Sequence, residues 1–380
     1  MASALGRFRM LDLSRQLPGP YCSMLLADLG MDVLVVSAPT DPMGMGIPLL
    51  GRNKRSLTLN LKAPEGREIF HRLTGDADVV LEGSRPGAAA RLGVDYATLK
   101  RINPRLVYCS ISGYGQDGPY RDRVGHDVNY LGFAGVIGLT GSAGAPPAIP
   151  GVQIADIGGG TLMAAVGILS ALWAREETGE GQFVDIAMMD GAVAWQVIHL
   201  ARWFADREEP SRGDTLLTGH HPCYAIYETK DGRHVTVGAL EPHFWRTLCE
   251  RLGLPELAGR QFAEGEEREA MFARVRACFR ERTMREWVDL LADLDICFGP
   301  VAKLSEMVED PQVRHRGMIL DADDGRGGRM RTFGNPVKLG ATPAAIRTPP
   351  ARLGEHTDAV LAALGYAPAD VVALRERGVV

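Results

Sequence analysis

The sequence lacks the features that mark several common classes of protein. Its six cysteines lie far apart and include no Cys-x-x-Cys pair, so neither a zinc site nor a disulfide framework is expected. No apolar run reaches the roughly 18 residues of a membrane span, and the longest, Leu162–Trp173, predicts a buried helix. The formal charge of −5 excludes a generally basic nucleic-acid binder. With a start too short and polar for a signal peptide and no peroxisomal tripeptide at the end, the sequence favours a cytoplasmic enzyme.

A complete dinucleotide-binding fingerprint is missing as well. The first predicted strand is followed by Ser14–Pro20, which has no G-x-G-x-x-G, and the second ends in Val36-Ser37-Ala38 without an acidic ribose ligand. Gly113–Gly118 does match the glycine pattern, but Pro119 and charged residues follow it instead of an apolar helix. We therefore expect no dinucleotide cofactor, although such a turn lets the backbone approach a ligand closely.

The N-terminal segment has the pattern of a parallel α/β sheet. Phe8–Leu13 predicts a strand, Tyr21–Leu29 a helix opened by the preceding prolines, and Asp32–Val36 a second strand. A strand, a helix and a strand in this order form a βαβ unit. The sequence therefore predicts a large doubly wound, Rossmann-like parallel-sheet domain.

The chain is long enough for two domains. We expect the large α/β domain at 1–204 and a charged, proline- and glycine-containing linker at 205–222. Residues 223–338 open with a hairpin signal around Asp231-Gly232, which indicates a smaller α+β domain. Residues 339–380 are expected to return to the large domain.

One loop at the predicted edge of the sheet is a candidate ligand site. The strand Asp78–Leu81 delivers Glu82–Gly87 at its carboxyl end, where open α/β sheets place their ligand-binding loops. Arg85, and Arg91 further on, have the charge to meet phosphates. The alternative is that both arginines are solvated surface residues.

The stretch Gly125–Gly160 contains the groups that a proton-transfer site needs. His126 and Asp156 both exchange protons when their surroundings tune them. Two such groups on opposite sides of one carbon can remove a proton from one face and return it to the other. The backbone N–H groups of 157–160, at a helix start, are candidates for holding the enolate charge.

Simpler interpretations of these residues stay open on chemistry alone. His126 and Asp127 can form a satisfied loop pair, and Asp156 can be the N-cap of the apolar helix. Glu241 before a proline can be only a helix-start acid. His220-His221 invites a metal interpretation, but no further ligand spacing supports it, so no metal is expected.

Taken in order, the motifs of the whole chain resemble those of the family III CoA-transferase superfamily, and within it the α-methylacyl-CoA racemases. Members that transfer CoA use the aspartate as a nucleophile and generally lack the histidine of Gly-His-Asp, which is present here. The motifs that carry the resemblance are Leu17–Pro20, Asn53–Leu57, Glu82–Gly87, Arg91–Gly93, Ser112–Gly115, Gly125–Tyr130, Asp156–Gly160, Gly181-Gln182, Asp190-Gly191, Asp231-Gly232 and Leu353–His356.

The resemblance implies a racemase whose catalytic pair, His126 and Asp156, moves the α-proton of a 2-methylacyl-CoA thioester. It implies that Glu241 partners the histidine, that the Tyr130 hydroxyl lies beside the aspartate, and that the protein is an interlocked homodimer. No cofactor is implied, because the CoA moiety is part of the substrate. The CoA contacts implied are Leu59, Asn60, Leu61, Lys62, Gly83, Ser84, Arg85, Arg91, Gly125, Asp127, Val128 and Asn129.

Two alternatives and two departures accompany this assignment. The chain can instead be a CoA-transferase that uses Asp156 as the acyl-accepting nucleophile, or a CoA-binding protein without catalysis. Ser37-Ala38 stands where relatives usually carry charge, and Ser84 where an aromatic residue is common. These departures bear on CoA affinity and acyl preference more than on the type of reaction.

Overall fold

The computed structural model describes residues 3–40 and 47–380, and the chain divides into two compact units. The first unit combines the chain up to Val136 with Pro150–Gln196 and Pro311–Val380. The second combines Ile137–Ile149 with Val197–Asp310. Each unit is therefore built from segments that are distant in sequence.

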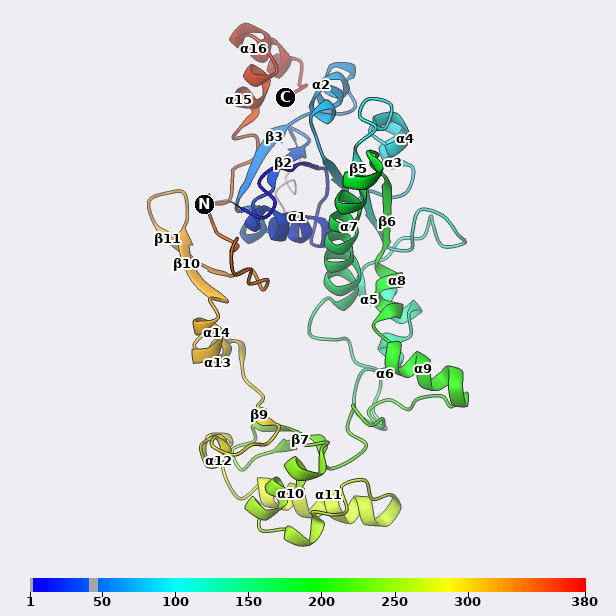
Figure 1. Ribbon diagram of the computed structural model, residues 1–380, viewed down its shortest axis with the longest axis vertical. Helices are drawn as coiled ribbons and strands as arrows, with labels where there is room; N and C mark the ends of the chain where they lie inside the picture. The colour runs from blue at the N-terminus through cyan, green and yellow to red at the C-terminus, as the bar shows by residue number, and fades with distance from the viewer. Residues whose placement is uncertain (1–2, 41–46) are drawn as a thin grey trace. The chain divides into compact units, whose positions relative to one another are not determined.

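A six-stranded parallel sheet forms the centre of the first unit (Figure 1). Its order, β3-β2-β1-β4-β5-β6, reverses direction between β1 and β4, and such a reversal opens a crevice at the carboxyl edge of the sheet. The predicted parallel α/β sheet is thus confirmed. The strands are β1 (Arg9–Asp12), β2 (Asp32–Ser37), β3 (Lys54–Thr58), β4 (Val79–Glu82), β5 (Val107–Ser112) and β6 (Phe183–Ala187).

Several helices of the first unit begin at a proline, as predicted for the first of them. The missing N–H of proline costs nothing in the first turn of a helix. Residues 192–204 are divided between two helices, α8 (Met188–Ala194) of this unit and α9 (Val197–Asp206) of the second. The helices and helical turns of this unit are α1 (Pro18–Asp28), η1 (Pro48–Gly51), α2 (Pro64–Gly75), α3 (Ala88–Arg91), α4 (Tyr96–Leu99), α5 (Asp127–Phe133), η2 (Ile154–Leu162), α7 (Met163–Thr178), α8 (Met188–Ala194), α14 (Pro311–His315), α15 (Thr357–Ala363) and α16 (Pro368–Glu376).

The C-terminal segment completes the core beside β3 and α2 (Figure 1). Leu361 of α15 and Leu374 of α16 belong to the same apolar cluster as Leu57 and Phe70. The backbone joins as well, because the N–H of Asn60 donates to the carbonyl of Val379 at 2.7 Å. Buried apolar surface of this kind contributes about 25 cal/mol per Å².

The helix η2–α7 differs from its prediction in length and in burial. It runs unbroken over Ile154–Thr178, 25 residues, which by length and composition alone is enough to cross a membrane, as core helices of soluble proteins also are. The prediction that α7 is buried all round is wrong. One stripe along it is exposed, and we call this set the α7 stripe: Leu162, Val166, Leu169 and Trp173, with exposed fractions of 37%, 58%, 38% and 77%.

The second unit has a small antiparallel sheet covered by helices. The predicted hairpin is confirmed, since β7 (Tyr224–Glu228) pairs antiparallel with β8 (His234–Gly238) and Gly232 takes the left-handed conformation in the turn. β9 (Phe298–Pro300) adds the third strand. The helices of this unit are α9 (Val197–Asp206), α10 (Pro242–Arg251), η3 (Pro255–Leu257), α11 (Gly265–Phe279), α12 (Met284–Leu291) and α13 (Leu304–Met307), while α6 (Val136–Leu139) begins at its boundary.

The boundaries of the units differ from the predicted domains 1–204, 205–222, 223–338 and 339–380. The hairpin of β10 (Ile319–Asp323) and β11 (Arg329–Phe333), predicted within the small domain, belongs to the first unit. Arg52 holds it there through hydrogen bonds to the hydroxyl of Thr332 and the carbonyl of Phe333. Such long-range bonds leave no local signal in the sequence.

Candidate active site

A cavity of about 1170 Å³ lies at the carboxyl edge of the parallel sheet, within the first unit. It occupies the place that the strand order predicts, because the segments that follow β1 to β5 all contribute to it. Its lining consists of selected residues within 13–19, 82–94 and 121–130, residues 36–38, 59–62 and 111–114, and Met188.

The cavity is lined by more cations than anions, in a chain whose net charge is negative. Such a lining favours a ligand with several negative charges, such as one that carries phosphates. The sequence analysis named only two of these cations, because the others follow strands and loops without a motif of their own. The basic lining residues are Arg15, Lys62, Arg85, Arg121 and Arg123, and the buried acid among them is Glu82.

Most of the predicted CoA contacts lie in this lining. Arg91, Asp127 and Val128 are not part of it, and Arg91 is an exposed residue at the end of α3. All of the CoA contacts stay predictions. The predicted residues that the cavity brings together are Leu59, Asn60, Leu61, Lys62, Gly83, Ser84, Arg85, Gly125 and Asn129.

His126 is placed at the cavity by the start of α5. It is the N-cap residue of this helix, with extended backbone, and its side chain is exposed and lines the cavity. Its N–H donates to Oδ1 of Asn129 at 3.0 Å, and the N–H of Asn129 donates back to its carbonyl at 2.8 Å. This reciprocal pair fixes the backbone of His126 while leaving the imidazole available.

Asp156 lies in the first turn of η2 and is half-buried. The N-cap alternative is wrong, because η2 begins at Ile154 and its N-cap is Gln153. Burial, and then the charge of Asp127, raise the pKa of Asp156 to about 6, while the charge of His126 lowers it. A carboxyl group with this pKa exchanges protons close to neutral pH.

The side chain of Asp127 joins the segments that contain His126 and Asp156. Its Oδ1 accepts a hydrogen bond from the backbone N–H of Asp156 at 3.0 Å. The loop-pair alternative assigned this carboxylate to His126, but the carboxylate bonds to the backbone of Asp156. The prediction that Asp127 contacts CoA gains no support from its place outside the cavity lining.

Tyr130 sits between two glycines whose missing side chains make room for its ring. A Cβ at Gly113 would lie 2.5 Å from the ring, and one at Gly125 would lie 2.8 Å from it. The hydroxyl donates to the carbonyl of Gly125. Burial and the charge of Asp156 raise the pKa of Tyr130 to about 12, so this hydroxyl keeps its proton at neutral pH.

The glycines after Asp156 have a packing role. A Cβ at Gly159 would lie 2.4 Å from the carbonyl oxygen of Met188, and one at Gly160 would lie 3.0 Å from Pro18. These glycines therefore let η2 approach α8 and α1 closely. Since Ile157 N–H is bonded to the Gln153 carbonyl and the Asp156 N–H to Asp127, the turn has fewer free donors for an enolate than the sequence predicts.

Glu241 belongs to the second unit. It is the exposed N-cap residue of α10, and its carbonyl accepts from the N–H of Trp245 at 3.1 Å. The helix-start interpretation accounts for this position. Its implied partnership with His126 stays a prediction.

Glu82 is a buried acid at the cavity that the sequence analysis treated only as part of a loop motif. It is 4% exposed, accepts from the Ser110 hydroxyl, and accepts from the N–H of Ser84 at 2.7 Å. Burial raises its pKa despite these hydrogen bonds. Its place at the end of a fully buried strand is the signal that could have found it.

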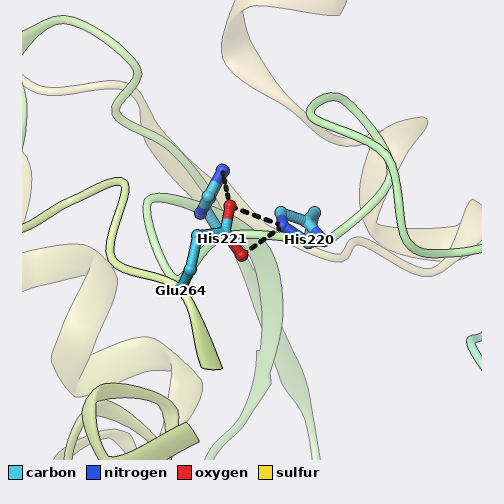
Figure 2. A group of neighbouring side chains, drawn as sticks. All are labelled: His220, His221 and Glu264. Atoms are coloured by element: carbon cyan, nitrogen blue, oxygen red, sulfur yellow. Dashed lines mark hydrogen bonds and ion pairs between the residues drawn. The ribbon is translucent and has the colours of Figure 1, made fainter. Parts of the chain in front are cut away.

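The pair His220-His221 lies in the second unit beside Glu264 (Figure 2). The Nε2 of His220 is 3.0 Å from Glu264 Oε2, and its Nδ1 is 2.7 Å from Asp214 Oδ1. The guanidinium of Arg268 lies 3.7 Å from each of these carboxylates. Because Arg268 supplies the positive charge that the carboxylates require, we interpret the group as an ion-pair cluster that fastens the chain before β7 to the start of α11.

Comparisons with known proteins identify the family of the chain. The model of "CoA-transferase family III" matches residues 5–357. The alpha-methylacyl-CoA racemase of Homo sapiens is 36% identical over 379 residues, 98% of this chain and 96% of that protein. The succinyl-CoA:glutarate CoA-transferase of Homo sapiens is 30% identical over 371 residues, which cover 93% of this chain and 84% of that protein. The crystal structure of a CAIB/BAIF family protein from Brucella suis is similar with a TM-score of 0.82 and 30% identity, covering 96% of this chain and 100% of that chain. The chain therefore belongs to CoA-transferase family III.

Proposed function

We propose that this protein is a racemase that interconverts (R)- and (S)-2-methylacyl-CoA thioesters. The observation that carries the proposal is that the Asp127 side chain connects the segments of the two proton-transfer residues. Asp156 is hydrogen-bonded to Asp127, the residue next to His126, and its pKa is raised to about 6. His126 thus lines a phosphate-compatible cavity, and Asp156, bonded to the next residue, has a carboxyl group that exchanges protons close to neutral pH.

The reaction requires only that a proton is removed from the α-carbon and that a proton is returned to it. One residue, acting as the base, takes the α-proton, and the electron pair of the broken C–H bond moves to the thioester oxygen to form an enolate. The conjugate acid of the other residue then protonates the opposite face of the α-carbon. Each such step contributes typically 10²- to 10⁴-fold to the rate. Because no electron is gained or lost overall, the reaction requires no redox cofactor.

His126 favours racemisation over CoA transfer. A transferase needs a carboxylate that attacks the thioester, which is a task for Asp156 alone. The exposed imidazole at the cavity has no part in that attack. The match to racemases at 36% and 34% identity supports the same choice, while transferases at 30% to 33% identity keep the second reaction as the alternative.

The α7 stripe supports a homodimer. Four apolar side chains at helical spacing are exposed along one face of η2–α7. An exposed apolar surface of this kind marks an interface, and we commit to a second copy of this chain as its occupant, as the resemblance implies. In such an interlocked dimer we propose that Glu241 of the partner subunit completes the site beside His126.

Exchange of the α-proton with solvent tests the proposal. In heavy water, a pure (R)-2-methylacyl-CoA incubated with the enzyme should epimerise and take up deuterium at the α-carbon, with no acceptor acid present. His126→Ala and Asp156→Asn should each slow this exchange by roughly 10²-fold or more. Absence of both epimerisation and deuterium uptake with short, long and branched acyl chains would contradict the proposal.

CoA transfer, the alternative reaction, would give a different result with the same protein and acyl-CoA. A CoA-transferase would form an acyl-aspartyl bond at Asp156, which hydroxylamine converts to a hydroxamate that mass spectrometry locates. His126→Ala would then spare activity. A CoA-binding protein without catalysis would show neither deuterium uptake nor a hydroxamate while still binding the acyl-CoA.

A further inference from the structure

Asp127 occupies an unusual position between the two catalytic residues. It is the first residue of α5 and follows His126 directly, and it is half-buried. Its Oδ1 accepts from the Asp156 N–H at 3.0 Å, although the two residues are 29 positions apart. Its side chain therefore ties the start of α5 to the start of η2.

We propose that the Asp127 carboxylate is a positioning residue that acts through Asp156, setting both its location and its charge state, rather than a contact to CoA. This inference rests on the proposed function, because it concerns the proton transfer by His126 and Asp156. It differs from the sequence prediction, which counted Asp127 among the residues that bind CoA.

The positional part follows from the hydrogen bonds at the two ends of the connection. His126 is fixed on α5 by its reciprocal bonds with Asn129. The first turn of η2 is closed by the bond from Ile157 N–H to the Gln153 carbonyl at 3.0 Å. Together with the packing of η2 against α5, α8 and α1, the bond between Asp127 and Asp156 sets how the two proton-transfer residues face each other. Reacting groups must be placed to within about 1 Å for full activity.

The electrostatic part follows from the like charge of the two carboxylates. Burial is the largest cause of the raised pKa of Asp156, the charge of Asp127 adds to it, and the charge of His126 opposes it. Tyr130, also on α5, stays neutral because its pKa is about 12. The titratable groups on the other elements packed against η2 are Tyr21, Cys22 and Asp28 on α1, Arg175, Glu176 and Glu177 on α7, Asp185 on β6 and Asp190 on α8.

Two substitutions at this position separate the two parts. Asp127→Asn keeps an oxygen that can accept from the Asp156 N–H but removes the charge, whereas Asp127→Ala removes both. Asp117→Asn is the control, since it removes an exposed acid of the same unit whose charge is not among those that act on Asp156. The readout is kcat and KM for deuterium exchange of (R)-2-methylacyl-CoA between pH 4.5 and 9.

The proposal expects three results. Asp127→Asn should keep kcat within about threefold at pH 8 and move the acid limb of kcat/KM to lower pH by roughly half to one unit. Asp127→Ala should lower kcat roughly ten- to hundredfold at pH 8 with little change in KM. Asp117→Asn should leave both unchanged. An unshifted acid limb in Asp127→Asn, or a rise in KM without a loss of kcat in both variants, would overturn the proposal.

A second measurement keeps the inference independent of activity. The titration of Asp156 can be followed by NMR in protein labelled with ¹³C at the aspartate carboxyl groups, with Asp156→Asn to assign the signal. The midpoint should fall in Asp127→Asn and stay in place in Asp117→Asn. If the wild type exchanges no α-proton but this midpoint falls, the proposed function fails and the charge coupling stands. If the midpoint does not move, the inference fails whatever the activity.

Discussion

The buried ion pair between Arg52 and Asp28 offers a sharp test of how the C-terminal part of the chain is held. Arg52 donates from Nε to Asp28 Oδ1 at 3.0 Å and from Nη2 to Oδ2 at 2.7 Å. The two side chains are 3% and 1% exposed. Arg52 also donates to Thr332 and Phe333 of the β11 strand, so the pair joins α1 to a segment about 280 residues away.

We predict that Arg52→Met lowers the free energy of unfolding by about 3–5 kcal/mol, the usual cost of leaving a buried charge without its partner. The remaining donors near Asp28 are neutral amides, with the Asn53 Nδ2 at 2.8 Å. Replacing both charges, as in Asp28→Leu with Arg52→Met, should recover much of this loss, because no charge is then buried. Urea unfolding followed by circular dichroism measures both effects.

The chain contains a matched control for this prediction. Arg55 and Asp32 form a pair of nearly the same geometry, with Nε–Oδ1 at 3.1 Å and Nη2–Oδ2 at 2.8 Å. Both side chains of this pair are 43% exposed, so Arg55→Met should cost less than about 1 kcal/mol. Equal losses for Arg52→Met and Arg55→Met would refute the reasoning, because geometry and not burial would then determine the cost.

Three further predictions concern the active site and the interface. Folding raises the pKa of Asp156 from 3.8 to about 6, so the protonated carboxyl favours folding below about pH 4, and this contribution is lost as the pH rises through 6. Asp156→Asn, which cannot ionise, should therefore stabilise the protein by up to about 3 kcal/mol at pH 8 and by nothing at pH 4, as measured by thermal unfolding. Gly159→Ala should lower the free energy of unfolding by about 1–3 kcal/mol, because the added carbon overpacks against Met188. Gly75→Ala in α2, where nothing lies within 4 Å of the added carbon, should not destabilise the protein, and equal urea midpoints for the two variants would contradict the packing argument. Trp173→Glu, on the α7 stripe and 77% exposed, should shift the proposed dimer to monomer in light scattering, and an unchanged mass would exclude this face from the proposed interface.

Local patterns in the sequence carried much of the fold. The alternation of apolar strands and proline-opened helices predicted the parallel sheet, and Asp231-Gly232 predicted the hairpin in the second unit. The physical cause in both cases is short-range: backbone preference and turn chemistry. His126 was singled out as a proton-transfer group and Tyr130 only by the resemblance, and the structure places them at the N-cap and within one short helix.

Other features depend on partners that are remote in sequence. The α7 stripe is as apolar as a core helix, and only the packing of Ala164 and Ile168 inward tells which face is buried. The hairpin β10–β11 belongs to the first unit because Arg52 bonds to it across about 280 residues. An ion pair or a hydrogen bond between residues so far apart produces no periodic pattern in the sequence.

The candidate site also combines features that the sequence predicts with features that depend on the fold. By itself, the sequence determined which residue types are present for proton transfer, since His126 and Asp156 follow from motifs. Tertiary structure alone decided their surroundings, because the pKa of Asp156 results from burial and from the Asp127 carboxylate that the fold brings to it. Desolvation and charge act through space, and distances in space are set only when the chain has folded.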